Sequence, residues 1–325
     1  MSRVRVLAWI AVVALALGAS PGASADDYPT RPVRLVAPFP PGGVVDILAR
    51  TIGQRLSVAL GQSVVVENRP GAGGTIGADN VAKAAPDGYT LLLGSVAMLS
   101  IAPSVYPVMT YDPVRDFVPI ATLADVPVVL VVGKAVPARS VRELIALAQA
   151  RPETLTFGSS GNGAVPHLAG VLFMNLTGTR LVHVPYRGTA QAINDMMAGQ
   201  ISMIFDNLPS SLSFIQSGSV VALGIGSARR SPSLPDLPTI AEAGVPGYEM
   251  GGWFGVLAPA GTADAVTGRL RAEIGRALDD AEFRTRLAGF GTEPLVTSEA
   301  EFRAMIASDL AKWAEIVKAN HVKVD

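Results

Sequence analysis

The stretch VRLVAPFPPGGVVDILARTIGQRLSVALGQSVVVE, residues 33–67, decides the fold class. Its pattern indicates an apolar strand at Val33–Ala37, a helix from about Val45 to Leu60 and a second apolar strand at Val64–Glu67. Strands that are apolar throughout and are separated by a helix are typical of a parallel sheet covered on both faces. The stretch therefore predicts an α/β protein.

The alternation of strands and helices continues beyond this stretch, from Ile76 to Phe205. The run Phe117–Val132 is longer than one ordinary strand. It indicates either two strands or one strand that leaves a first lobe and enters a second. We expect a return crossing near residues 222–230. Two crossings of this kind form a hinge that permits closure on a ligand.

Chain length also favours two lobes, because about 300 residues exceed what one core usually organises. We expect residues 26–122 and 229–325 to form the first lobe and residues 123–228 to form the second. Each lobe should contain a mostly parallel sheet that is flanked by helices.

The N-terminal residues 1–25 have the features of an export signal. Two arginines precede the apolar run Val6–Leu17, and Ala23-Ser24-Ala25 matches the small-x-small pattern that signal peptidase accepts. The run is too short to span a bilayer as a permanent helix, although a retained anchor is the alternative. We expect cleavage after Ala25 and a periplasmic mature protein.

Charge and cysteine content exclude several classes of site. The chain contains 26 Lys and Arg, 27 Asp and Glu, and no Cys. This balance, without a basic cluster interleaved with aromatics, gives no support for nucleic-acid binding. The absence of Cys excludes disulfides and thiolate metal sites, and His167, His183 and His321 lack metal-ligand spacing. We expect no metal, no cofactor and no nucleic-acid partner.

The first candidate binding loop is Phe39-Pro40-Pro41-Gly42-Gly43-Val44-Val45-Asp46, where a strand leads into a helix. In open α/β sheets, ligands bind at such junctions, beyond the carboxyl ends of the strands. No Ser, Thr, Asp or Asn precedes the helix directly, so its first amides lack an obvious side-chain cap and suit a carboxylate. Gly42 and Gly43 leave room for it. Asp46 either orients a water or a ligand cation or merely counters the helix dipole.

Four further junctions carry candidate ligand contacts. The loop Phe157–Gly163 offers Ser159, Gly161 and Asn162 as donors, unless it is only a mobile surface loop. His167 follows in the first helical turn, where a lone histidine is more often structural than ligand-binding. Other candidates are Ser95, an early hydroxyl; Arg187 and Thr189 in the stretch 184–190; and Asp206 after an apolar strand. Arg187 pairs with a ligand carboxylate or with an acid of the protein, and Asp206 receives a ligand donor or caps the next helix.

Two glycine-containing stretches resemble motifs for dinucleotide binding and for hydrolysis, but their residue spacing does not match either motif. In Gly71–Gly77 the last glycine stands one residue late for a dinucleotide fingerprint. Ser160 lacks the second glycine of a G-x-S-x-G nucleophile elbow, and His167 follows it too closely for a typical triad partner. The sequence therefore favours a binding protein over an exported hydrolase, which remains the less favoured interpretation.

These junctions resemble those of the tripartite tricarboxylate transporter substrate-binding proteins, also called Bug receptors. The matching stretches cover nearly the whole mature chain, and their combination is specific. They are Tyr28-Pro29, Pro32-Val33-Arg34, Pro38-Phe39-x-Pro41-Gly42-Gly43-x-x-Asp46, Val66–Gly74, Ala85–Thr90, Val182–Gly188, Phe205-Asp206-Asn207 and Ser231–Thr239.

The resemblance implies a two-lobed periplasmic-binding-protein fold, type II-like, with a hinge of crossing strands and no catalysis. It implies a monomer that holds a small organic carboxylate by backbone amides, water and small side chains. Integral-membrane transporter subunits are the implied partners, and a sensor ectodomain is the alternative. The residues that it assigns to the ligand are Phe39, Gly42, Gly43, Asp46, Ser159, Gly161, Asn162, Tyr186, Gly188 and Asp206.

Two departures from the family pattern concern the kind of carboxylate. Val44 stands where such proteins often carry a small polar residue, and the apolar segment 96–103 replaces a loop that is commonly polar. We expect Val96, Ala97, Met98, Leu99 and Ala102 to lie at the mouth of the cleft. These side chains would favour a carboxylate with a substantial apolar or aromatic part over citrate or a polar amino acid.

Overall fold

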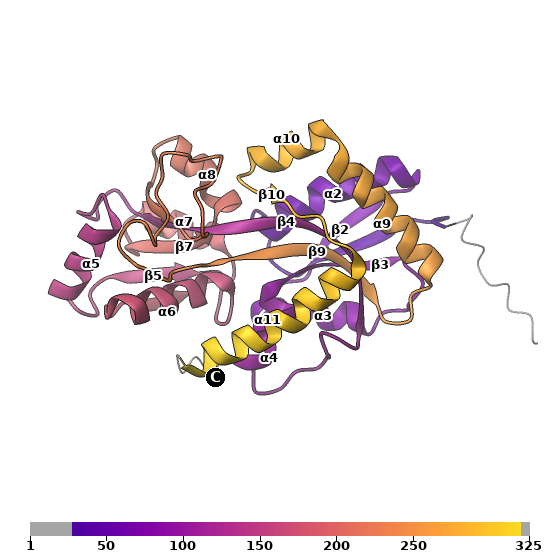
Figure 1. The fold of residues 1–325 in the computed structure, drawn as a ribbon, viewed down its shortest axis with the longest axis horizontal. Helices are drawn as coiled ribbons and strands as arrows, with labels where there is room; N and C mark the ends of the chain where they lie inside the picture. Colours follow the sequence, from indigo (N-terminus) through magenta and orange to yellow (C-terminus); the bar gives the residue numbers. More distant parts are fainter. Residues whose placement is uncertain (1–27, 320–325) are drawn as a thin grey trace, which may run out of the picture.

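The computed structural model describes residues 28–319, and the expected signal peptide lies outside them. An elongated α/β molecule has two lobes that are joined by two long strands (Figure 1). The strands run in the order β2 (Val64–Asn68), β1 (Val33–Ala37), β3 (Thr90–Ser95), β9 (Gly251–Pro259), β4 (Phe117–Val132), β7 (Met203–Asn207), β5 (Thr156–Ser159) and β6 (Val182–Pro185). Two further strands, β8 (Val221–Ile225) and β10 (Glu293–Pro294), pair with β4 off this path. The first lobe contains β1, β2 and β3, and the second lobe contains β5, β6 and β7.

The parallel core of the first lobe is formed by β1 (Val33–Ala37), β2 (Val64–Asn68) and β3 (Thr90–Ser95). Leu35 and Val36 are both fully buried and belong to different hydrophobic clusters. Both faces of the sheet are therefore covered, as the largely apolar strands predicted.

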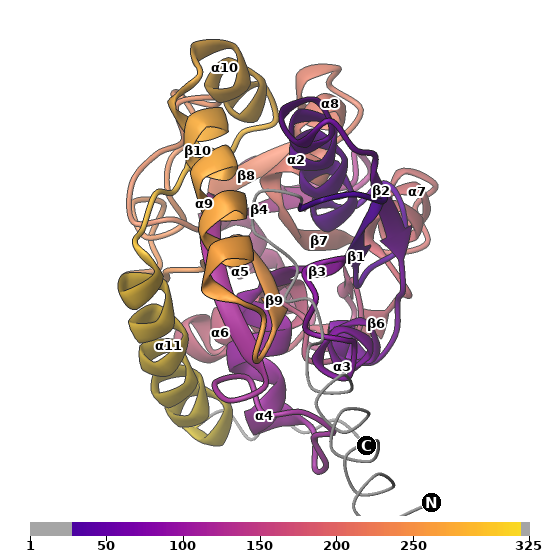
Figure 2. The ribbon, with the colours of Figure 1, turned by 90° about the vertical axis from the view of Figure 1, so that its right-hand side faces the viewer.

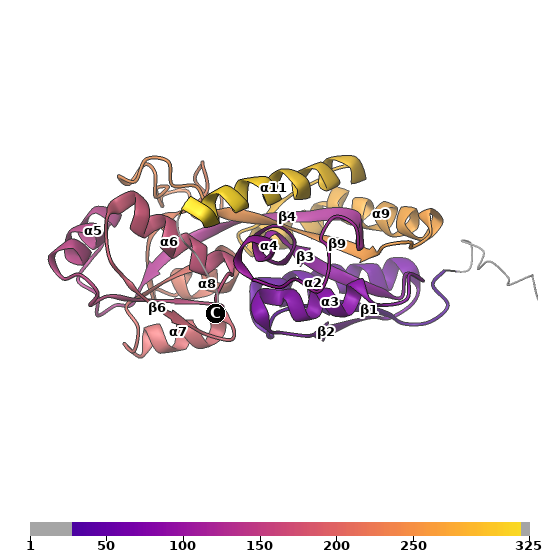
Figure 3. The same ribbon diagram turned by 90° about the horizontal axis from the view of Figure 1, so that it is seen from below.

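Helices cover the first sheet on both faces (Figure 2). One face carries α2 (Val44–Leu60), α9 (Asp264–Asp279) and α10 (Ala281–Gly289). The other carries α3 (Thr75–Ala82), the π-helical turn η3 (Ala97–Ile101), α4 (Ala102–Val105) and α11 (Glu299–Ala319). Figure 3 shows α11 lying along the crossing strands toward the second lobe. Its residues Trp313 and Val317 are buried. No helix within residues 28–319 has the length and apolar character of a membrane span.

The second lobe repeats the same layered arrangement. Its parallel strands are β5 (Thr156–Ser159), β6 (Val182–Pro185) and β7 (Met203–Asn207), and β8 (Val221–Ile225) adds an antiparallel strand beside β4. Its helices are α5 (Val141–Ala150), α6 (Val165–Thr177), α7 (Thr189–Met197) and α8 (Leu208–Gln216). Each lobe thus has a mostly parallel sheet with flanking helices, as predicted.

The outward crossing is β4 (Phe117–Val132). Of the two alternatives that the length of this run left open, the structure shows one strand that passes from the first lobe into the second, and not two separate strands. Residues Phe117–Pro127 pair with β9 (Gly251–Pro259), and Val128–Val132 pair with β7 and β8. β10 (Glu293–Pro294) pairs with the middle of β4. One strand therefore belongs to both sheets.

The return crossing is β9, which begins about twenty residues later than the expected crossing near residues 222–230. The intervening segment packs on the second lobe: Tyr248 contacts Phe173 and Phe205, and its hydroxyl donates to the Ala169 carbonyl at 3.1 Å. The lobe boundary at residue 229 stays a prediction. We propose that the segment up to Met250 belongs with the second lobe.

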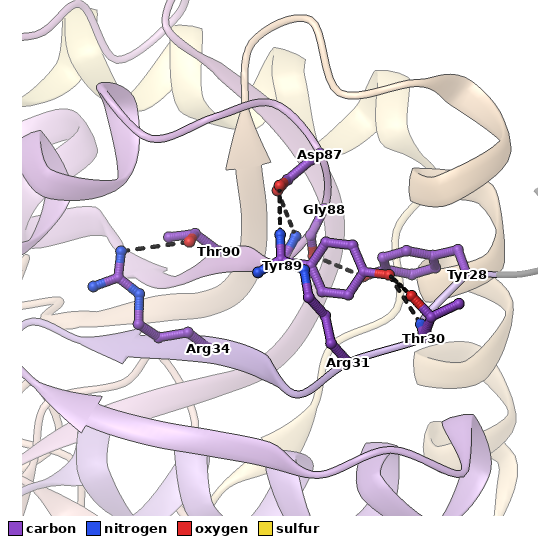
Figure 4. Close-up of polar contacts among 8 residues, drawn as sticks. All are labelled: Tyr28, Thr30, Arg31, Arg34, Asp87, Gly88, Tyr89 and Thr90. Carbon is purple, nitrogen blue, oxygen red and sulfur yellow. Dashed lines mark hydrogen bonds and ion pairs between the residues drawn. The ribbon is translucent and has the colours of Figure 1, made fainter. Parts of the chain in front are cut away.

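The start of the described chain is bound firmly to the first lobe (Figure 4). The Tyr28 hydroxyl donates to the Gly88 carbonyl at 2.7 Å, and the Thr30 amide donates to the Tyr89 hydroxyl at 2.9 Å. The Arg31 guanidinium lies 4.0 Å from the centre of the Tyr89 ring and forms an ion pair with Asp87. Burial raises the pKa of the Tyr28 hydroxyl well above its ordinary value. Tyr28 is thus an integral core residue.

Replacing Tyr28 with Ala should lower the free energy of unfolding by about 3 kcal/mol or more, because it empties a buried aromatic site. Tyr28→Phe keeps the packing and loses one hydrogen bond, so it should cost only about 1 kcal/mol. Urea denaturation of the mature protein measures both values. Equal costs for the two variants would show that the ring contributes little.

Candidate functional site

A cavity of about 260 Å³ lies between the two lobes. Its wall is formed by residues at the ends of the strands β1, β3, β5, β6 and β7 or in the segments that follow them. The first lobe supplies Phe39, Pro40, Pro41, Gly43, Val44, Val45, Ser95, Ala97 and, from β9, Phe254. The second lobe supplies Ser160, Ala164, Val165, Pro166, Arg187, Gly188, Thr189, Ala190, Gln191 and Asn207. This is the predicted position beyond the carboxyl ends of the strands.

Four helix N-termini meet at this cavity. The residues that precede α2, α6, α7 and α8 all line it: Gly43, Ala164, Gly188 and Asn207. None of the four caps its helix with a side-chain hydrogen bond, whereas Ser140 and Asp280 do so for α5 and α10. Uncapped amides and the positive ends of four helix dipoles make the cavity attractive to an anion.

Asp46 braces the glycine loop from within. Its Oδ2 accepts from the Gly42 amide at 3.1 Å, and its Oδ1 accepts from Arg50 at 2.9 Å and Asn68 at 3.0 Å. Burial would raise the pKa of Asp46, but the hydrogen bonds from Arg50 and Gly42 outweigh it and hold the pKa below its usual value. Asp46 and Gly42 do not line the cavity, because this carboxylate is engaged in shaping the loop.

A histidine pair holds the loop 159–163. The Ser159 hydroxyl lies 2.7 Å from His183 Nε2, and the His183 ring stacks on His167 with a centroid distance of 4.1 Å. His167 Nδ1 accepts from the Gly163 amide at 3.2 Å. Burial lowers the pKa of His167 to about 4 and that of His183 to about 3, so both rings are neutral at pH 7. The structural alternative for His167 is therefore the one that the geometry supports.

Of this loop, only Ser160 lines the cavity; Ser159 is buried outside the lining, and Asn162 is exposed. The Gly161 amide donates to the Ser159 hydroxyl at 3.1 Å. The Asn162 carbonyl accepts from the Tyr106 hydroxyl at 3.1 Å, which joins the second lobe to the first. The sequence did not identify His183 as a residue that supports this loop. The only signal for that role is its position on β6, the strand that pairs with β5, which carries Ser159.

Tyr186 and Asp206 also act behind the cavity wall. The Tyr186 hydroxyl donates to Asp195 at 2.8 Å. Asp206 is fully buried and accepts from the Ser211 hydroxyl at 2.7 Å. Burial raises the pKa of Asp206 to about 7, although hydrogen bonds from Ser211, Asn207 and Thr189 oppose this. Asp206 thus supports Thr189 and Asn207, which do line the cavity.

The apolar segment 96–102 lies differently from what the sequence suggested. Only Ala97 lines the cavity, while Val96, Met98, Leu99 and Ala102 are buried in the core of the first lobe. The reason is the π-helical turn η3, which packs against α11 and turns these side chains inward. The apolar wall is formed instead by Phe39, Val44, Val45, Val165 and Phe254. No local signal marks Phe254, which comes from a distant strand.

Comparison with known proteins agrees with this geometry. Residues 48–322 match the family described as Tripartite tricarboxylate transporter family receptor, TctC. Protein BugT of Bordetella pertussis is 38% identical over 325 residues and is covered completely, as is this chain. A protein of Pseudomonas sp. strain P51, described as a UPF0065 protein in the tcbD-tcbE intergenic region, is 40% identical over 98% of this chain and 94% of its own.

Similar solved structures have the same two-lobed fold. The R. palustris protein Rpa4515 with adipate is 39% identical with a TM-score of 0.90, over 92% of this chain and 100% of its own. The periplasmic binding protein BugD is 37% identical with a TM-score of 0.87, over 91% of this chain and 100% of its own. MatC from Rhodopseudomonas palustris with bound malate is 33% identical with a TM-score of 0.85, over 89% of this chain and 100% of its own. These likenesses confirm the expected periplasmic-binding-protein fold.

Asp206→Asn should change how the stability of the unliganded protein depends on pH. The pKa of Asp206 is about 7 in the folded protein, against about 3.9 in an unfolded chain. The parent therefore loses stability as the pH rises from about 4 to 7, because only the unfolded state releases the proton. Asn does not ionise, so over this pH range the free energy of unfolding of the variant rises relative to that of the parent, by up to about 4 kcal/mol. Urea denaturation at several pH values measures the difference.

The two histidines titrate alike in parent and variant, so their contribution cancels in this difference. Asp236→Asn, at an exposed position, is the matched control and should give a much smaller change with pH. Parallel stability curves for the parent and Asp206→Asn would contradict the raised pKa.

Proposed function

We propose, because this chain belongs to the tripartite tricarboxylate transporter receptor family, that it is a periplasmic solute-binding protein that captures a small organic carboxylate between its two lobes. The observation that carries the proposal is the meeting of four uncapped helix N-termini at one cavity. The adipate and malate bound to Rpa4515 and MatC support the same ligand class.

We assign the predicted binding residues to two roles. Phe39, Gly43, Ser95, Gly188 and Thr189 line the cavity and contact the ligand. The remaining predicted residues hold the loops in shape: Gly42, Asp46, Ser159, Gly161, Asn162, His167, Tyr186 and Asp206. Backbone amides at the helix N-termini are the main donors to the carboxylate.

The wall favours a carboxylate with an apolar segment. Phe39, Val44, Val165 and Phe254 have no side-chain hydrogen-bonding groups. A hydroxyl or ammonium group placed against them would lose its hydration without a partner, at a cost of about 1–3 kcal/mol. Citrate, malate and polar amino acids should therefore bind more weakly than aliphatic or aromatic carboxylates of similar size.

Binding without turnover is the activity that we infer. Ser159 and His183 lie within hydrogen-bond distance, but Ser159 is buried behind the cavity wall. The pKa of His183, lowered to about 3, makes that ring a poor general base. We propose that the protein is a monomer that delivers its ligand to integral-membrane transporter subunits. Delivery to a sensor ectodomain is the second candidate.

Export should remove residues 1–25, which lie outside the described chain. The basic start, the apolar run and the Ala23-Ser24-Ala25 motif support cleavage after Ala25. Tyr28 then stands third in the mature protein, where its buried ring ties the new N-terminus to the fold. N-terminal sequencing of periplasmic material tests this, and a start at Met1 would contradict it.

Gly43→Val should abolish ligand-induced stabilisation. A Cβ at Gly43 meets nothing closer than the Pro40 carbonyl at 3.9 Å, so the fold should tolerate the change. The added side chain stands where α2 begins, at the cavity wall, and obstructs the helix amides. A ligand at a hundred times its dissociation constant stabilises the parent by about 2.7 kcal/mol, so its loss is measurable.

Thermal unfolding with adipate, hexanoate and benzoate provides the measurement. The control is Gly268→Val in α9, where a Cβ meets nothing within 4 Å and the cavity is remote. It should bind like the parent. Binding by Gly43→Val within threefold of the parent would refute the role of the glycine loop.

A further inference from the structure

The two lobes touch at a rim of the cleft, where the end of α4 faces the loop that follows β5. The Tyr106 hydroxyl of the first lobe donates to the Asn162 carbonyl of the second lobe at 3.1 Å. A Cβ placed on Gly73, in the first lobe, would lie 2.9 Å from the Tyr106 hydroxyl and 3.4 Å from the Asn162 carbonyl oxygen. A Cβ placed on Gly163 would lie 3.1 Å from Val105 Cγ1. We call these five residues the rim contact.

The rim contact is separate from the surface that faces a ligand. The cavity lining includes none of its five residues. Asn162 is exposed and Tyr106 is half-buried, so their hydrogen bond lies at the edge of the cleft. This bond therefore acts between the two lobes and not on a solute.

Each half of the rim contact is fixed within its own lobe. The Tyr106 amide donates to the Ala102 carbonyl at 2.9 Å, which closes the last turn of α4. On the other side, the Gly163 amide donates to His167 Nδ1 at 3.2 Å. Because both halves are held by bonds inside their lobes, they meet only in this relative position of the lobes. A separation beyond about 3.5 Å ends a hydrogen bond, so a small rotation of the lobes breaks the contact.

We propose that the rim contact is a latch: it holds the lobes closed over a bound solute and thereby sets how fast the solute leaves. This inference rests on the proposed function, in which the two lobes enclose a carboxylate. Both lobes supply the cavity lining, so the solute is released when the lobes separate and the rim contact breaks. A contact that is present only in the closed state shifts the equilibrium between closed and open states. Because it does not touch the solute, it should act equally on every ligand.

Tyr106→Phe tests the hydrogen bond of the latch, since it removes the hydroxyl and keeps the ring. The dissociation constants for adipate, hexanoate and benzoate should rise by one common factor of about three to ten, the range of one net hydrogen bond. The rise should come mainly from faster dissociation. Isothermal titration calorimetry of the mature protein measures the dissociation constants, and surface plasmon resonance measures the dissociation rates.

The matched control is Tyr89→Phe. The Tyr89 hydroxyl accepts from the Thr30 amide at 2.9 Å inside the first lobe, and Tyr89 lies outside the cavity lining. This variant also loses one hydrogen bond, but that bond is present whether the lobes are open or closed. Its dissociation constants and dissociation rates should therefore stay within twofold of the parent. Melting temperatures of the unliganded variants show that each is folded.

A cysteine pair across the rim contact provides a second test. A Cβ on Gly163 would lie 3.7 Å from Val105 Cβ, a separation that suits a disulfide, and the natural chain contains no cysteine. The double variant Val105→Cys with Gly163→Cys is compared in its oxidised and reduced forms, so each preparation is its own control. Oxidation with adipate bound should slow adipate release at least a hundredfold. A thiol reductant should restore the release rate of the reduced form.

Four results would overturn the inference. Tyr106→Phe leaves every dissociation constant and dissociation rate within twofold of the parent, or it weakens one ligand far more than the others, which would mean that the hydroxyl reaches the solute. The oxidised cysteine pair releases adipate as fast as the reduced pair, or the pair fails to oxidise, which would show that the lobes do not meet here. Failure of every carboxylate to bind the parent would instead overturn the proposed function, and oxidation of the unliganded pair would then still report whether the lobes meet at this rim.

Discussion

Pairing of β4 with β9 is the constraint on which the rest of the structure depends. β4 bonds to β9 over Phe117–Pro127 and then to β7 and β8 over Val128–Val132, so one strand is shared by two sheets. This sharing turns the carboxyl ends of the parallel strands in both lobes toward the same cavity. The pairing is irregular at two points between Pro119 and Ala124, where the register shifts. Such bulges bend and twist a strand locally, and these two lie within the sheet of the first lobe, where the same stretch of β9 also pairs with β3.

The sequence predicted those parts of the fold in which local pattern and tertiary packing agree. Val33–Ala37 and the following helix were recognisable because four of the five strand residues are apolar and the helix has a clear period. The return crossing was missed because the segment before β9 is rich in Pro and Gly and has no period. Its position depends on Tyr248, which packs against two phenylalanines distant in sequence. Such contacts cannot be read from the local sequence.

The same limit applies to the site. The missing cap before α2 indicated an anion-binding helix terminus, and Gly43 does line the cavity. Polar side chains at the junctions, such as Asp46 and Asp206, were candidates for the ligand because polar groups in such loops need partners. The structure gives each of them a partner inside the protein instead, the Gly42 amide for Asp46 and the Ser211 hydroxyl for Asp206. In the segment 96–102, a π-helical turn decides which way each side chain points, and no composition rule foresees it.

The stacked histidines determine how acid affects the loop beside the cavity. An ordinary histidine, with a pKa of about 6.5, would begin to charge in mildly acidic surroundings and repel its neighbour. His167 and His183 stay neutral until the pH approaches 4 and 3, respectively. A free carboxyl group has an unperturbed pKa of about 4. As a medium turns acidic, a carboxylate solute and His167 therefore change charge over the same range near pH 4, and both changes set the lower end of the pH range over which the loop can serve capture.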